Sequence, residues 1–191
     1  MKILIASDIH GSAEYSSKLF ESYKREMPDK LLLLGDILYH GPRNSLPDDY
    51  DTKKTMEILN SLKSKIIAVR GNCDAEVDQM VLNFPIMNSY EIIEADGIKI
   101  FASHGHHYDP HNLPPFVEFD VIATGHTHIP VLAKYDGFYH VNPGSVSIPK
   151  GGSEHSYMIF EEGEFILRRL NDGKMLDKMQ VKPLKNDMQL K

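Results

Sequence analysis

Short apolar runs separated by amphipathic segments organise the N-terminal part of this chain and favour a fold with a parallel sheet. Each run has the length of a strand buried on both faces, and the runs cover residues 3–6, 31–34 and 66–69. Apolar side chains recur at helical spacing elsewhere, which predicts helices over residues 15–27, 56–62 and 75–82. Ser12 is placed to cap the first of these helices. Because strand–helix–strand crossovers are right-handed, this βαβαβ order predicts parallel strands.

The second half of the chain is richer in antiparallel strands. Turn dipeptides such as Asp96-Gly97 divide it into three predicted hairpins, over residues 91–102, 131–141 and 157–170. One further buried run covers residues 121–124. An α+β fold accommodates both halves: two mixed β-sheets pack as a sandwich, and helices flank it in an αββα four-layer order. The charged segment from Lys174 onward is expected to be partly frayed.

Composition and charge exclude several classes of protein. The 191 residues suit one domain, and 41% hydrophobic with 25% charged residues describes an ordinary globular protein. A formal net charge of −6 provides no basic surface for sequence-specific nucleic-acid binding or for an anionic membrane. No stretch reaches the roughly 18 apolar residues of a membrane span, and the apolar start is too short for a signal peptide. The single cysteine, Cys73, has no disulfide partner, so a reducing compartment, the cytoplasm, is expected.

Five polar clusters carry chemically useful side chains, and each lies at or directly after an apolar run. They are Asp8-Ile9-His10, Gly35-Asp36, Gly71-Asn72-Cys73-Asp74, His104-Gly105-His106 and Gly125-His126-Thr127-His128. Any one cluster is a weak signal, since an Asp-x-His sequence is more often a turn or a helix cap. Their common placement is informative, because loops at the carboxyl ends of strands share one edge of a sheet. We therefore predict that these side chains converge on one metal site.

The ordered set of these clusters resembles the calcineurin-like metallophosphoesterase superfamily. The resemblance covers about residues 1–150 and includes the stretches 40–44 and 142–152. It implies a two-metal site and hydrolysis of a phosphodiester by in-line attack of a metal-bridging hydroxide. It also implies the ligands: Asp8, His10 and His128 for one metal, Asn72, His104 and His126 for the other, and Asp36 as the bridge between both.

The donor types support a metal site independently of the resemblance. Oxygen and imidazole ligands without thiolate suit borderline divalent ions such as Mn, Fe, Co, Zn or Ni, and argue against a dedicated Mg or Ca cage. We expect two divalent ions, and the resemblance makes Mn²⁺ the first choice. Two such ions bring +4 while Asp8 and Asp36 bring −2, so about +2 remains to attract a phosphate group.

The remaining catalytic candidates surround these ligands. At the position of Cys73 the superfamily usually has a histidine that contacts the substrate phosphate, and a neutral thiol is a poorer proton donor at pH 7. This departure implies substrates with good leaving groups or another donor such as His106. Arg43 can contact a phosphate oxygen or hold its own loop, and Asp74 is expected to cap the next helix or to orient a neighbour. The catalytic candidates are Asp36, Asn72, Cys73, His106 and Arg43.

Two alternative functions stay open. A phosphomonoesterase would use the same site, because the sequence does not show whether the pocket has room for a second esterified group. A non-catalytic scaffold is the other alternative, since a retromer subunit resembles this fold and acts as a binding surface. The complete set of ligands favours the enzyme. We expect a small phosphodiester as substrate, and the resemblance allows a homo-oligomer, either a dimer or a tetramer.

Overall fold

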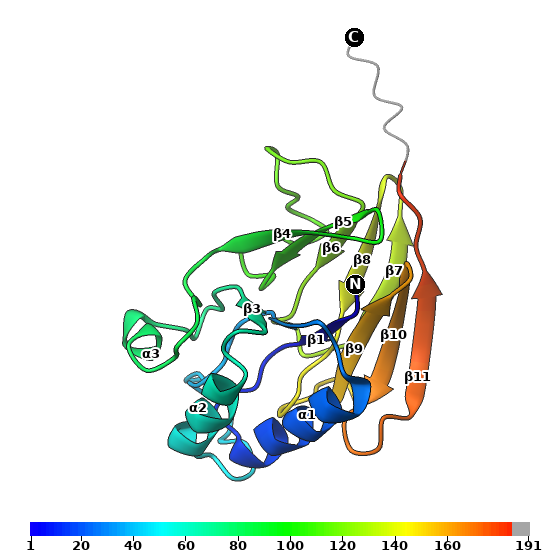
Figure 1. Ribbon diagram of the computed structural model, residues 1–191. Helices are drawn as coiled ribbons and strands as arrows, with labels where there is room; N and C mark the ends of the chain where they lie inside the picture. The colour runs from blue at the N-terminus through cyan, green and yellow to red at the C-terminus, as the bar shows by residue number, and fades with distance from the viewer. Residues whose placement is uncertain (185–191) are drawn as a thin grey trace.

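The computed structural model describes residues 1–184, in which two mixed β-sheets pack face to face (Figure 1). The first sheet has the strand order β11-β10-β9-β1-β2-β3. Its strands are β1 (Ile3–Ala6), β2 (Lys30–Leu33), β3 (Ile66–Ala68), β9 (Ser156–Glu161), β10 (Glu164–Arg169) and β11 (Met175–Gln180). β1, β2 and β3 run parallel, which confirms the prediction for the N-terminal part, and β9 runs antiparallel to β1.

The second sheet has the strand order β4-β5-β6-β8-β7. Its strands are β4 (Tyr90–Ala95), β5 (Ile98–Ser103), β6 (Val121–Ala123), β7 (Val131–Tyr135) and β8 (Phe138–Asn142). The three predicted hairpins are confirmed as the antiparallel pairs β4–β5, β7–β8 and β9–β10. β5, β6 and β8 are parallel neighbours, so both sheets are mixed. The predicted α+β sandwich is therefore confirmed.

Capping side chains decide where the helices begin and end. Ser12 caps α1 (Ala13–Glu26), since its Oγ accepts a hydrogen bond from the N–H of Tyr15 at 3.3 Å. Asp51 caps α2 (Thr52–Ser61), which starts earlier than predicted for this reason. α3 (Glu76–Gln79) is shorter than the predicted helix over residues 75–82. Its end is fixed by Gln79, whose side chain bonds the backbone of Leu82, Phe84 and Ile86.

Three apolar layers hold the sheets and helices together. Ile5 and Phe160 of the first sheet meet Ile100 of the second in the core between the sheets. α1 and α2 cover the outer face of the first sheet, where Leu19 and Leu59 belong to the packed cluster. The loop of residues 104–120 packs on the outer face of the second sheet. Helices thus flank one side of the sandwich and this loop, which carries three prolines, covers the other.

The segment after Lys174 differs from the expectation of a frayed tail. Residues 175–180 form β11, which pairs with β10, and Lys178 lies 2.9 Å from Glu164. The expectation is therefore wrong for this strand. Most β11 side chains are exposed, so the sequence carries no alternation of buried and exposed residues there. The last part of the predicted tail, residues 185–191, lies outside the described residues. No helix within residues 1–184 is both long and apolar enough to cross a membrane.

Candidate metal centre

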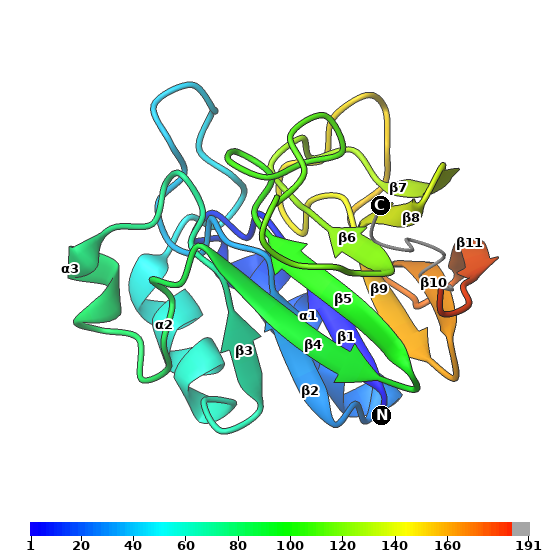
Figure 2. The same cartoon turned by 90° about the horizontal axis from the view of Figure 1, so that it is seen from above.

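Loops from both sheets meet at one edge of the sandwich. Figure 2 shows the light-blue loop after β2, the green loop after β5 and the yellow loop after β8 on the same side of the molecule. The predicted polar clusters follow β1, β2, β3, β5 and β6, and the structure brings them together at this edge. Strand order explains this, because β1, β2 and β3 are parallel neighbours, as are β5, β6 and β8.

Asp8, His10 and His128 form the first group of donors. All three are buried, and Nε2 of His128 lies 3.3 Å from Oδ1 of Asp8. Nε2 of His10 lies 3.3 Å from Nε2 of His128 and 3.7 Å from the same oxygen of Asp8. These side chains are close enough to ligate one cation.

The second group of donors meets the first at Asp36. Nε2 of His104 lies 3.1 Å from Oδ1 of Asn72 and 3.5 Å from Oδ1 of Asp36. Oδ2 of Asp36 lies 3.8 Å from Nε2 of His10, on the side of the first group. His126 adds a half-buried ring whose centroid is 5.0 Å from that of His104. The two oxygens of Asp36 therefore face different groups of donors.

Backbone carbonyls orient three of the imidazole rings. Nδ1 of His10 is 2.8 Å from the carbonyl oxygen of Tyr39, and Nδ1 of His104 is 2.6 Å from that of Leu34. Nδ1 of His128 is likewise 2.6 Å from the carbonyl oxygen of Ile148. Because a carbonyl oxygen only accepts hydrogen bonds, each Nδ1 carries a proton. Nε2 of each ring then faces the other donors, as in histidines that bind metals.

The electrostatics of the site fit bound cations. Oδ1 of Asp8 is buried without a hydrogen-bond partner in residues 1–184. Burial opposes a charge on His104, yet the hydrogen bond to Asp36 and the charge of Asp8 outweigh it and raise the pKa of His104 to about 9. Burial alone would raise the pKa of Asp36, but bonds from His104 and from the N–H of Cys73 hold it below its usual value. Divalent cations would replace the proton of His104 and satisfy Asp8.

Several candidate ligands have strained backbones. Positive φ angles are found at Asp8 (56°), His10 (50°), Asp36 (53°), His126 (65°) and His128 (61°). Such angles are uncommon outside glycine and cost about 1–3 kcal/mol each, so the surrounding structure must hold them. For Asp8 this support comes from Ser145 and Ser147, whose hydroxyls donate to its carbonyl oxygen at 2.8 and 3.1 Å. Strain concentrated on these residues is typical of a functional site.

Close packing explains two glycines of the predicted clusters. A Cβ atom on Gly71 would overlap Asp36, and one on Gly125 would overlap Ser7. Neither glycine has a positive φ, so space and not backbone conformation requires glycine at both positions.

Asp74 connects the loops after β2 and β3. Its buried carboxylate accepts hydrogen bonds from the N–H groups of Asp36 at 2.9 Å, Ile37 at 2.8 Å and Gly71 at 2.7 Å. Burial is the main reason that the pKa of Asp74 is raised to about 6. Of the two expected roles, orienting a neighbour agrees with these contacts, because Asp78 and not Asp74 accepts the hydrogen bond from the N–H of Ala75, the residue directly before α3.

Replacing Asp74 with alanine should weaken both folding and metal binding. Three buried N–H groups would lose their acceptor, so the free energy of unfolding should fall by about 2–4 kcal/mol. Because Asp36 would lose its support, affinity for Mn²⁺ should fall by about 10–100-fold. Urea denaturation and calorimetric titration measure the two effects, with Asp136→Ala on the exposed β7–β8 turn as the control. Unchanged affinity for Mn²⁺ in Asp74→Ala would contradict this role.

A cavity of about 440 Å³ opens above the donors. Its lining includes Asp36, Asn72 and His126, and at its margin the exposed side chains of Arg43 and Lys150. The positive charges of these two side chains favour an anionic ligand. Lys150 was missed in the sequence interpretation, although it belongs to the stretch 142–152 that carries the resemblance.

Two catalytic candidates lie beside the donors. The ring of His106 is 5.3 Å from that of His104, and burial is the main reason that its pKa is lowered to about 4. Cys73 lines the cavity, and burial together with the nearby charge of Asp36 raises the pKa of its thiol. His106 is therefore neutral and Cys73 is protonated at pH 7. His40 packs edge-on against the ring of Tyr39, and it does not line the cavity.

Known proteins share this fold and much of the sequence. Residues 1–164 match the model of the calcineurin-like phosphoesterase superfamily domain. Phosphodiesterase YfcE of Escherichia coli strain K12 is 43% identical over 183 residues, which cover 96% of this chain and all of that protein. The solved structure of E. coli YfcE covers 95% of this chain and 100% of its own, with a TM-score of 0.91. Vps29 of Entamoeba histolytica in complex with Zn²⁺ shares the fold, with a TM-score of 0.63 and 22% sequence identity. The match covers 94% of this chain and 98% of that protein. This chain belongs to the calcineurin-like phosphoesterase superfamily.

Proposed function

We propose that this chain is a metal-dependent phosphodiesterase. The main support is Asp36, whose two carboxylate oxygens face separate groups of oxygen and imidazole donors. The chain belongs to a phosphoesterase family and is 43% identical to an enzyme named phosphodiesterase YfcE. Both findings support hydrolysis of a phosphoester.

The donors of the candidate centre would hold two divalent cations, with Mn²⁺ as our first choice. Asp8, His10 and His128 would hold one, and Asn72, His104 and His126 the other, with Asp36 between them. When bound, such ions lower the pKa of water and stabilise negative charge on the attacking and leaving oxygens of a phosphoester.

The other side chains of the cavity bind and orient the substrate. Arg43 and Lys150 line the cavity and can contact phosphate oxygens through charged hydrogen bonds. His106 is not part of the cavity lining and lies beside the ring of His104. Its neutral ring can contribute a hydrogen bond there, but at pH 7 it holds no second proton to release. The protonated thiol of Cys73 is a poor nucleophile, which agrees with direct attack by water.

A comparison of two activated substrates tests the proposal. Protein loaded with Mn²⁺ should hydrolyse bis(p-nitrophenyl) phosphate with a kcat/KM about tenfold or more above that for p-nitrophenyl phosphate, because the cavity has room for a second esterified group. Release of p-nitrophenolate is followed by absorbance. The reverse preference would identify a phosphomonoesterase, and no hydrolysis of either compound by metal-loaded protein would favour the scaffold.

One observation favours phosphomonoesterase activity as the second candidate. A phosphomonoester carries one more negative charge than a diester near neutral pH, and the cavity offers two positively charged side chains, Arg43 and Lys150, for that charge.

The cytoplasmic location and the homo-oligomer stay predictions of the sequence.

A further inference from the structure

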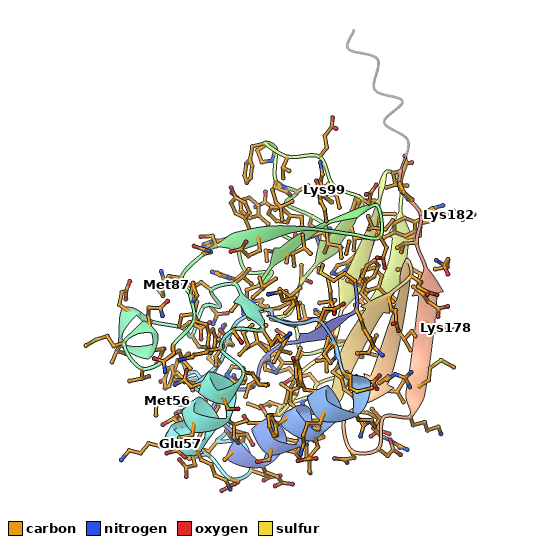
Figure 3. All side chains as sticks on the ribbon, in the orientation of Figure 1. Met56, Glu57, Met87, Lys99, Lys178 and Lys182 are labelled. Atoms are coloured by element: carbon orange, nitrogen blue, oxygen red, sulfur yellow. The ribbon has the colours of Figure 1, made fainter. Side chains whose placement is uncertain are left out.

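A second hollow adjoins the metal centre, between α2 and α3. This groove has a volume of about 570 Å³, and its apolar lining includes Tyr39, Tyr50, Met56, Cys73, Val77 and Val81. Figure 3 labels Met56 and Glu57, which reach it from α2. Lys53, Glu57 and Asp78 add polar groups to the lining. Cys73 lines both this groove and the cavity above the metal donors, so the two hollows meet at this residue.

The groove exposes more apolar surface than folding requires. Val77 is 64% exposed, and Tyr39 and Val81 are each 42% exposed. Val77 and Val81 are spaced to share one face of a helix, but α3 ends at Gln79 and leaves both side chains in contact with water. A concave site with an apolar lining and a few polar groups is the usual form of a small-molecule binding site.

The position of the groove relative to the metal centre is held by Tyr39. Its carbonyl oxygen accepts the hydrogen bond from Nδ1 of His10 at 2.8 Å, while its side chain lines the groove. Cys73 has a similar double contact, because its N–H donates to Oδ1 of Asp36 at 2.8 Å. A phosphate group above Asp36 would therefore have the groove directly beside it.

We propose that the groove binds an aromatic ester group of the substrate, and that the enzyme selects phosphodiesters carrying such a ring. This inference rests on the proposed function. The groove is continuous with the phosphate cavity at Cys73, and Tyr39 and Tyr50 supply ring faces and edges for stacking. Lys53, Glu57 and Asp78 can bond polar atoms on the edge of a heteroaromatic ring, whereas an alkyl chain offers no such atoms.

Variants that fill or strip the groove test this inference. Val81→Trp adds a large side chain to the groove, and Tyr50→Ala removes an aromatic wall. Each should raise KM for bis(p-nitrophenyl) phosphate by about tenfold. The inhibition constant of inorganic phosphate, which has no ester group, should change by less than about twofold, because phosphate does not enter the groove. Ile92→Trp on β4 is the matched control, since Ile92 is also 42% exposed and lies outside the groove.

The outcomes separate this inference from the proposed function. If the wild-type protein hydrolyses the diester and both variants keep its KM, the groove does not bind the ester group and the inference is wrong. If wild-type protein loaded with Mn²⁺ has no activity, the proposed function fails instead. Bound Mn²⁺ and circular dichroism confirm that each variant is folded. If Val81→Trp dissociates an oligomer in sedimentation, a second copy of the chain occupies the groove and the inference is also overturned.

Discussion

Substitution of Asp36 by asparagine is expected to lower kcat/KM for bis(p-nitrophenyl) phosphate by about a thousandfold, the largest effect among the point variants. The two carboxylate oxygens of Asp36 face both groups of donors, at 3.8 Å from His10 and 3.5 Å from His104. The amide has one acceptor oxygen and no charge, and its NH₂ group would face the ring of one histidine. Shared coordination of two cations would therefore be lost.

The fold should survive this change. The contacts that fix the loop run from the backbone N–H of Asp36 to Asp74, and these do not depend on the Asp36 side chain. Metal content by mass spectrometry should fall by at least one ion per chain, while circular dichroism stays unchanged. Asp136→Asn on the exposed β7–β8 turn controls for the loss of one negative charge. Retention of both metal content and hydrolysis in Asp36→Asn would refute the bridging role and, with it, the proposed mechanism.

Removal of metal is expected to abolish hydrolysis and to lower the melting temperature by about 10 °C. Nε2 of His10 lies 3.3 Å from Nε2 of His128, and Oδ1 of Asp8 has no hydrogen-bond partner in residues 1–184. Cations satisfy these groups only in the folded state. A ligand at a thousand times its Kd adds about 4 kcal/mol to the free energy of unfolding. For a chain of this length, each kcal/mol shifts the melting temperature by about 2–4 °C.

Chelation followed by addition of Mn²⁺ measures both effects. Differential scanning calorimetry before and after chelation gives the change in melting temperature, and the diester assay gives the activity. Addition of Mn²⁺ should restore both the melting temperature and the activity of the wild-type protein. The melting temperature of Asp36→Asn should rise less on the same addition. A chelated protein shown to hold no metal, yet with unchanged melting temperature and activity, would contradict a metal centre at these donors.

Much of the fold could be predicted because buried strands leave a local pattern in the sequence. The apolar runs at residues 3–6, 31–34 and 66–69 correspond to β1, β2 and β3, and the turn dipeptides correspond to the three hairpins. β11 could not be found in this way, since its side chains are mostly exposed and only its backbone pairs with β10. The assignment of the β9–β10 hairpin to the first sheet depends on its pairing with β1, a contact between distant parts of the chain.

The candidate site was predictable where each donor directly follows a strand. Asp8, Asp36 and His104 carry this signal, because parallel neighbours deliver the residues after their carboxyl ends to one edge. Ser145 and Lys150 were missed as parts of the site, although the first supports the strained backbone of Asp8 and the second lines the cavity. Hydroxyl and ammonium groups after a strand are too common in loops to indicate such roles.

The amino-acid sequence by itself determined the strands and hairpins, the order of the polar clusters and the type of donor that each cluster supplies. Only the tertiary structure decided that the oxygens of Asp36 face two groups, that Asp74 fastens one loop to the next and that an apolar groove meets the cavity at Cys73. The physical reason is the distance along the chain over which each interaction acts. Propensity, capping and alternation act between residues close in the chain, whereas distances of 3–4 Å between donors arise from packing of two sheets that local sequence does not encode.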